Sequence, residues 1–165
     1  MKVLVVSDSH SGLSFMRSWA SVLAPQVIIH LGDHYGDGQI LGEEFPGSSL
    51  IQVPGNCDLY RSMICEPEII FTKLDGVSVY LTHGHRHGVK SGTRQLLTAA
   101  RSSKADIVLY GHTHQEECYC CSDGMWVMNP GSCGSSGGSV GFIEIHNGKL
   151  AQCRILYRED MEEFE

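Results

Sequence analysis

Residues 1–33 read MKVLVVSDSHSGLSFMRSWASVLAPQVIIHLGD, and this stretch decides the fold class. The β-branched run at 3–6 is typical of a strand buried in a parallel sheet. After a polar loop, apolar residues recur at helical spacing, namely Leu13, Met16, Ala20 and Leu23. Pro25 ends this helical segment, and a second apolar run follows at 27–31. The order strand, helix, strand predicts a βαβ unit with two parallel strands.

The rest of the chain shifts from mixed α/β patterns to strands and turns. In the middle we expect helices at 39–44 and 91–102, and strands at 50–53 and 107–110. Asp-Gly or Asn-Gly pairs predict hairpin turns at 75–76, 123–124 and 147–148. Two sheets packed face to face, with helices outside, accommodate both patterns. The sequence therefore predicts two packed sheets flanked by helices.

Composition narrows the classes of function. With 165 residues, the chain is expected to form one domain over 1–165, with an acidic tail at about 158–165. The net charge of −7 argues against duplex nucleic acid, whose binding needs a basic surface. No apolar run approaches the ~20 residues of a membrane span, and the N-terminus reads as a first strand instead of a signal peptide. Together with the seven cysteines, these features favour a reduced, cytoplasmic protein, either a monomer or a homodimer through a sheet edge of the last third.

Five short apolar runs each end in side chains that bind metals. These side chains are Asp8, His10, Asp33, Asn56, His83, His112 and His114. Ligands of open α/β sheets bind beyond the carboxyl ends of the strands, so we expect these donors to meet at one edge. The set is large enough for two metal ions that share one carboxylate, an arrangement suited to phosphoryl chemistry. Nitrogen and oxygen donors without thiolate favour Mn, Fe, Zn or Ni over Ca or Mg.

The motifs at these strand ends carry a family resemblance. They are DSH at 8–10, GD at 32–33, GNCD at 55–58, THGH at 82–85 and GHTH at 111–114, followed by NPGS at 129–132. With these motifs the chain resembles the calcineurin-like metallophosphoesterase superfamily, and most closely its small YfcE-like phosphodiesterase branch. The resemblance extends over roughly residues 1–157. It implies the fold of that family, a four-layer α/β/β/α sandwich of two packed mixed sheets flanked by helices.

The resemblance also implies roles for the ligands. One metal ion would be held by Asp8, His10 and His114, the other by Asn56, His83 and His112, and both by the bridging Asp33. A water or hydroxide between the ions would attack a small phosphate ester, so that Asp33, Asn56 and His83 take part in catalysis through this water. The implied cofactor is two divalent ions per chain, with Mn as the expected metal and Fe, Ni or Zn as alternatives. The implied enzyme is a metal-dependent phosphodiesterase.

One motif departs from the wider family, where many members have Gly-Asn-His-Asp or Gly-Asn-His-Glu. This chain has Cys57 in place of that histidine, followed by Asp58. In those members the histidine stabilises the transition state or protonates the leaving oxygen, whereas a cysteine thiol is a weak donor with a pKa near ~8.5. Candidates for the missing proton donor are His34, His85 and His87. Asp58 and His85 are further catalytic candidates, and His30, inside an apolar run, is expected to be a core histidine.

Two other functions stay open beside the phosphodiesterase. The retromer subunit Vps29 resembles this fold and acts in protein assembly with a degraded metal set, while this chain keeps His10 and the other donors. A phosphomonoesterase or nucleotide hydrolase would use the same ligands with a different pocket. Metal content, together with turnover of bis-p-nitrophenyl phosphate, separates the enzyme from the scaffold.

Overall fold

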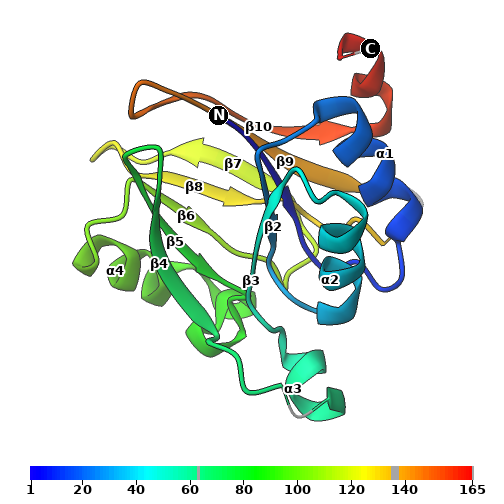
Figure 1. The fold of residues 1–165 in the computed structure, drawn as a ribbon. Coiled ribbons are helices and arrows are strands. Elements are labelled where there is room, and N and C mark those ends of the chain that lie inside the picture. The colour runs from blue at the N-terminus through cyan, green and yellow to red at the C-terminus, as the bar shows by residue number, and fades with distance from the viewer. Residues whose placement is uncertain (63, 135–137, 165) are drawn as a thin grey trace.

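The strands form two sheets that pack face to face (Figure 1). The computed structural model describes residues 1–62, 64–134 and 138–164. The first sheet has the strand order β10-β9-β1-β2-β3, and the second has the order β4-β5-β6-β8-β7. In the first sheet the strands span, in that order, Lys149–Tyr157, Ser139–His146, Lys2–Val6, Val27–His30 and Ser49–Gln52. In the second they span Ile69–Leu74, Val77–Thr82, Ile107–Leu109, Trp126–Asn129 and Glu117–Cys120.

Helices cover the outer faces of both sheets. The α-helices are α1 (Leu13–Leu23), α2 (Tyr35–Glu44), α3 (Asn56–Ser62) and α4 (Arg94–Ser102). Short 3-10 helices follow β5 and β10, namely η1 (His85–His87), η2 (Val89–Ser91) and η3 (Arg158–Glu163). Because α1 and α2 lie against the first sheet and α4 against the second, the fold is the predicted α/β/β/α sandwich (Figure 1). Within the described ranges, no helix combines the length and the apolar character needed to cross a membrane.

The side chains of β1 contribute to two apolar cores, one on each face of the first sheet. Val3 and Val5 point into the apolar core between the sheets, which also holds Leu81 of the second sheet. Leu4 and Val6 point the other way, into the core under α1. Successive residues of a strand face opposite sides, so an uninterrupted apolar run fills both cores. Burial of each aliphatic side chain of this kind stabilises the fold by ~1.5–3 kcal/mol.

The predicted βαβ unit and hairpins are confirmed. β1 and β2 are parallel, with Val3 opposite Val27, and α1 connects them. The pairs β4–β5, β7–β8 and β9–β10 are antiparallel around the predicted Asp-Gly and Asn-Gly turns. The predicted strand bounds agree with the structure to within one residue. The sequence pattern was therefore sufficient for the strands whose bounds it predicted.

The predicted bounds of two helices need correction. α2 begins at Tyr35 and not at residue 39, although it includes three glycines of low helix propensity. Tertiary contacts outweigh this propensity, because the Asp37 carboxylate in the first turn accepts hydrogen bonds from Ser9 Oγ and Ser11 N. α4 begins three residues later than predicted, because the preceding segment forms η2 and ends at a glycine with φ of 128°.

The helix α3 has no counterpart among the predicted elements. Its sequence, NCDLYRS, is too short to display a helical period. A polar contact marks its start, since Asp58 Oδ2 accepts the N–H of Gly55 at 2.8 Å, as in a capping box. Figure 1 shows α3 beyond the ends of β3 and β4, at one end of the molecule.

The acidic tail docks onto the first sheet. Its 3-10 helix η3 is followed by Phe164, whose ring centroid lies 5.9 Å from that of Trp19 in α1. The same ring lies 5.6 Å from Phe142 in β9, again edge to face. Aromatic pairs of this geometry stabilise a contact beyond the area they bury. The tail is therefore packed against the helical layer of the first sheet.

Candidate metal centre

Both sheets contribute side chains to one site. Asp8 follows β1 and Asp33 follows β2 in the first sheet, whereas His83 follows β5 in the second. His83 Nε2 lies 3.6 Å from Asp33 Oδ2 and 3.9 Å from Asp8 Oδ1. The carboxyl ends of strands from the two sheets thus meet, as the spacing of the sequence motifs predicts.

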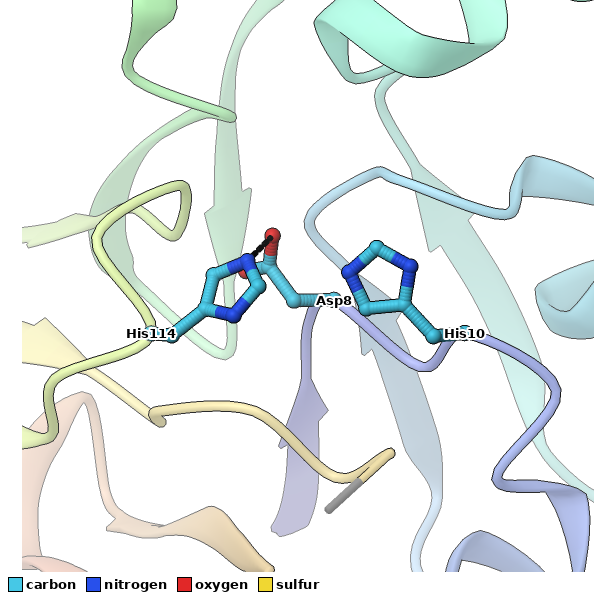
Figure 2. Close-up of side chains that lie close together, drawn as sticks. All are labelled: Asp8, His10 and His114. Carbon is cyan, nitrogen blue, oxygen red and sulfur yellow. Dashed lines mark ion pairs between the residues drawn. The ribbon is translucent and has the colours of Figure 1, made fainter.

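The first group of candidate ligands is Asp8, His10 and His114, whose ligand atoms lie within 4.8 Å of one another. Figure 2 shows Asp8 between the two imidazole rings, with His114 Nε2 3.1 Å from Asp8 Oδ1. The ring centroids of the two histidines are 5.3 Å apart. Asp8 is fully buried and both histidines are exposed, so the group opens to solvent on one side.

The second group is Asp8, Asp33 and His83, all buried and with ligand atoms again within 4.8 Å. His83 Nδ1 lies 2.7 Å from the carbonyl oxygen of Leu31. Because a carbonyl only accepts, the ring donates from Nδ1 and keeps a lone pair on Nε2. A histidine oriented by a backbone carbonyl in this way is preset to bind a metal through its other nitrogen.

Three buried atoms of the candidate ligands form no hydrogen bond within the described residues, namely Asp8 Oδ1, Asn56 Oδ1 and His83 Nε2. Asp8 Oδ1 has His114 Nε2 at 3.1 Å, a contact between two candidate ligands of the same group. A buried polar atom left unsatisfied costs ~1–3 kcal/mol, and such atoms are rare in folded proteins. The other oxygen of Asp8, by contrast, accepts from Ser7 Oγ at 2.6 Å and from His112 N at 3.0 Å. All three unsatisfied atoms offer lone pairs, which cations satisfy. The donor set therefore fits divalent metal ions.

His112 borders these two groups of carboxylate and imidazole ligands and belongs to neither. The ring centroid of His112 lies 5.0 Å from that of His83. Burial, followed by the effect of His83, lowers the pKa of His112 to about 4, so its ring is neutral at neutral pH and keeps a lone pair for a metal. Asn56 is half-buried at the start of α3. The next residue, Cys57, donates its backbone N–H to Asp33 Oδ1 at 2.9 Å.

Asp33 sits where two loops approach closely. A Cβ on Gly55 would lie 2.1 Å from Asp33 Oδ1, and Gly32 has φ of 99°, so glycine is required at both positions. Burial raises the pKa of Asp33, but His83 and the N–H of Cys57 outweigh it and hold the pKa below its ordinary value. Asp33 is therefore ionised at neutral pH, which is the form that binds cations.

Most candidate ligands have a strained backbone. The residues with φ between 40° and 71° include Asp8, His10, Asp33, His112 and His114. Left-handed φ is uncommon outside glycine and costs ~1–3 kcal/mol per residue. Such strain persists only where tertiary contacts enforce it, and it concentrates at functional sites. Its clustering at the ligand loops supports a functional role for them.

Asp58 holds the loop after β2 in place. Its Oδ1 accepts the N–H groups of His34 and Tyr35, and its Oδ2 accepts those of Asp33 and Gly55, all at 2.8–2.9 Å. The carboxylate is buried. These contacts make Asp58 a positioning residue for Asp33, while a direct catalytic part for it stays a prediction.

His30 is the buried core histidine that the sequence predicts. Its Nδ1 accepts the N–H of Gly32 at 3.2 Å, and its Nε2 lies 3.3 Å from Ser9 Oγ. Ser9 Oγ in turn donates to Asp37 Oδ2 at 2.7 Å. Asp37 thereby ties α2 to the loop after β1, a role that sequence reasoning missed because a lone Asp in a glycine-rich segment carries no signal.

His85 has a neighbour that sequence reasoning also missed. Its ring centroid lies 5.6 Å from that of His83, and its Nε2 lies 3.0 Å from Glu68 Oε2. The same carboxylate accepts two hydrogen bonds from Arg86, at 2.8 and 2.7 Å. Glu68 precedes β4, whose first residue, Ile69, pairs with Thr82 at the end of β5, and the antiparallel pairing brings Glu68 beside His85. Only the register of this hairpin could have predicted the contact from the sequence.

Comparison with known proteins assigns this geometry to a family. A family model described as the calcineurin-like phosphoesterase superfamily domain matches residues 1–148. The chain belongs to the calcineurin-like phosphoesterase superfamily. A probable metallophosphoesterase of Mycoplasma pneumoniae is 34% identical over 137 residues, covering 79% of this chain and 78% of that protein. A phosphodiesterase of Methanocaldococcus jannaschii is 29% identical over 147 residues, covering 81% and 84%.

The fold of this calcineurin-like phosphoesterase also matches solved structures. The wild-type Vps29 of Entamoeba histolytica complexed with Zn²⁺ superposes with a TM-score of 0.71 at 20% identity, covering 95% of this chain and 99% of that one. At this level of identity the likeness shows the fold alone. Family membership supports a phosphoesterase that uses divalent metals, and candidate ligand groups are present for them.

Proposed function

We propose that this calcineurin-like phosphoesterase holds two divalent metal ions per chain and hydrolyses phosphodiesters. The observation that carries the proposal is the set of three unsatisfied buried ligand atoms, Asp8 Oδ1, Asn56 Oδ1 and His83 Nε2, at the ends of β1, β3 and β5. The relative named as a phosphodiesterase supports a small diester as the substrate class. A phosphomonoester or a nucleotide is the alternative substrate.

The candidate ligands divide between the two ions. We assign Asp8, His10 and His114 to one ion, Asn56, His83 and His112 to the other, and Asp33 to both. The first set coincides with one group of mutually close ligand atoms, and Asp8 also belongs to the group that contains Asp33 and His83. Two carboxylates therefore lie near the shared position. The mixed nitrogen and oxygen donors favour Mn, with Fe, Ni and Zn as alternatives.

Two ions bound there would supply an activated water and would neutralise the phosphate oxygens. The residues of the chain orient the ligands and set their protonation. The Leu31 carbonyl fixes the tautomer of His83, and Asp58 fixes the loop that carries Asp33. The lowered pKa values of Asp33 and His112 keep their ligand atoms free of protons at neutral pH.

Asp33→Asn tests this proposal. The amide keeps the shape of the side chain and removes the charge assigned to both ions. We expect the variant to lose at least one ion and ~10²–10³-fold in kcat/KM for bis-p-nitrophenyl phosphate. Asp75→Asn makes the same chemical change in the exposed β4–β5 turn and should alter neither quantity. Normal binding of two ions together with wild-type turnover in Asp33→Asn would contradict the proposal.

The same measurements separate the alternative functions. Metal binding without turnover of any phosphate ester would favour a non-catalytic scaffold of the Vps29 type. Faster turnover of p-nitrophenyl phosphate than of the diester would favour a phosphomonoesterase. A screen of monoesters, diesters and nucleotides against the Mn-loaded protein covers both outcomes.

Three further proposals rest on the sequence. We propose one domain over residues 1–165, a cytoplasmic location, and either a monomer or a homodimer formed through a sheet edge. The last third of the chain contributes β10 and β7, which are edge strands of the two sheets. Light scattering after size-exclusion chromatography decides between monomer and homodimer, and cell fractionation tests the location.

A further inference from the structure

A hollow of about 370 Å³ lies beside the candidate metal centre. Its lining residues are Asn56, Leu59, Tyr60, His85 and Arg86. Asn56 is a proposed metal ligand, and His85 follows the proposed ligand His83 by two residues. Tyr60 lies one helical turn after Asn56 on α3, hence on the same side of that helix. The hollow therefore adjoins the position that the proposed function gives to the reacting phosphate.

Tyr60 gives this hollow an aromatic surface. Tyr60 is 89% exposed, more than any other large hydrophobic residue among the described residues. A ring so exposed contributes little to the stability of the fold, since burial is what stabilises apolar groups. Beside a phosphate site, it offers its face to a planar group. Stacking of a planar group on an aromatic side chain raises affinity by about 5- to 150-fold.

The charges around the hollow are already paired. The Arg86 guanidinium donates to both oxygens of Glu68, at 2.8 and 2.7 Å, in a bidentate ion pair. His85 Nε2 lies 3.0 Å from the same carboxylate. An anionic group in the hollow would meet the Glu68 carboxylate or would have to displace it from Arg86. The group that fits this environment is uncharged.

We propose that the hollow binds an uncharged aromatic ester group of the phosphodiester substrate, with Tyr60 stacked on its ring. This inference rests on the proposed function and narrows its substrate class. It favours diesters with one aromatic ester group over dialkyl diesters and over polyphosphates. Tyr60 is then the residue that determines this specificity.

The test uses two phosphinates, benzyl(methyl)phosphinate and dimethylphosphinate. Both carry the same anionic PO₂ group and resist hydrolysis, and they differ only in the aromatic ring. By calorimetric titration of the Mn-loaded protein, we expect the benzyl ligand to bind roughly tenfold more tightly. Tyr60→Ala should bring the two affinities together, and Tyr60→Phe, which keeps the ring, should preserve the preference. Tyr119→Ala is the control. It removes an exposed tyrosine from β7, which lies at the opposite edge of the second sheet from β4, and it should preserve the preference for the benzyl ligand.

The outcomes distinguish a failure of this inference from a failure of the proposed function. Equal affinities of the two phosphinates for the wild-type protein, with metal-dependent diester hydrolysis intact, would overturn the aromatic subsite and leave the proposed function standing. The same holds if Tyr60→Ala keeps the full preference for the benzyl ligand. Absence of both phosphinate binding and metal-dependent hydrolysis would overturn the two together.

Glu68→Gln tests the argument from charge. The amide releases the Arg86 guanidinium from its ion pair, which makes the hollow cationic. We expect (2-carboxyethyl)(methyl)phosphinate, whose side group is anionic, to bind more weakly than the benzyl ligand to the wild-type protein and to gain affinity in Glu68→Gln. A wild-type preference for the carboxyethyl ligand would overturn the assignment of an uncharged group.

Discussion

At the residue scale, His30 makes the stability of the fold depend on pH. Burial lowers its pKa from 6.5 to about 4, so the folded protein holds it neutral, with Nδ1 accepting the N–H of Gly32. Between these two pH values the unfolded chain binds a proton that the folded chain does not. Stability is therefore fully present above pH 6.5 and is lost as pH falls towards 4, by roughly 3 kcal/mol in total.

His30→Gln should remove most of this pH dependence, because glutamine does not titrate. The free energy of unfolding in urea, measured for both proteins with chelator present at pH 7 and pH 4.5, isolates the effect, since groups common to both cancel. We expect the wild-type protein to lose about 2–3 kcal/mol more than the variant on acidification. Equal losses in the two proteins would show that His30 does not carry the effect.

The sequence was sufficient to predict which residues are candidate ligands, but it did not predict their backbone conformation or protonation. Asp8 and His83 each follow an apolar strand, so residue type and spacing point to them. The left-handed backbone of Asp8 and Asp33 is imposed by contacts from other elements, and no local pattern signals it. The lowered pKa of His112 likewise depends on its burial and on the nearby His83. Both arise from tertiary packing, which no local sequence pattern signals.

At the element scale, Asp58 links α3 to the loop after β2. Asp58→Asn replaces one acceptor oxygen by an NH₂ group, so two of the four backbone N–H groups lose their acceptor. We expect a loss of about 2–4 kcal/mol in the free energy of unfolding. We also expect Mn²⁺ to bind ~10–100-fold more weakly, because the loop positions Asp33. Urea unfolding and Mn²⁺ titration measure the two effects.

Asp106→Asn is the matched control for that change. Asp106 is exposed and accepts one backbone N–H, from Ser78 at 2.7 Å. It precedes β6, whereas the ligand loop with His112 follows the other end of that strand. Asp106→Asn should cost less stability and leave Mn²⁺ binding unchanged. If Asp58→Asn bound Mn²⁺ as the wild-type protein does, Asp58 would not be a positioning residue.

The elements differ in how far the sequence predicted them. Strands and hairpins followed from apolar runs and Asp-Gly or Asn-Gly turns, since these signals are local. The first turn of α2 and the whole of α3 were missed, because the carboxylates of Asp37 and Asp58 stabilise them through contacts with other loops. The hollow beside Asn56 was hidden for the same reason, as it forms between α3 and the segment after β5.

At the scale of the whole molecule, the site exists only when the two sheets pack together. Asp8 and Asp33 come from the first sheet and His83 from the second, and the shared core between the sheets sets their separation. Metal ions that bind only the folded state add to its stability through this arrangement, by ~2.7 kcal/mol at a hundredfold excess over Kd. Folding, metal binding and activity are thus coupled in this protein.

Stoichiometric reconstitution with metal tests the central claim most directly. Protein stripped by a chelator is titrated with Mn²⁺, while bound ions per chain and turnover of bis-p-nitrophenyl phosphate are measured at each step. We predict that chelation abolishes turnover, that Mn²⁺ restores it, and that restoration is complete at two ions per chain. Full turnover by rigorously metal-free protein would contradict the account.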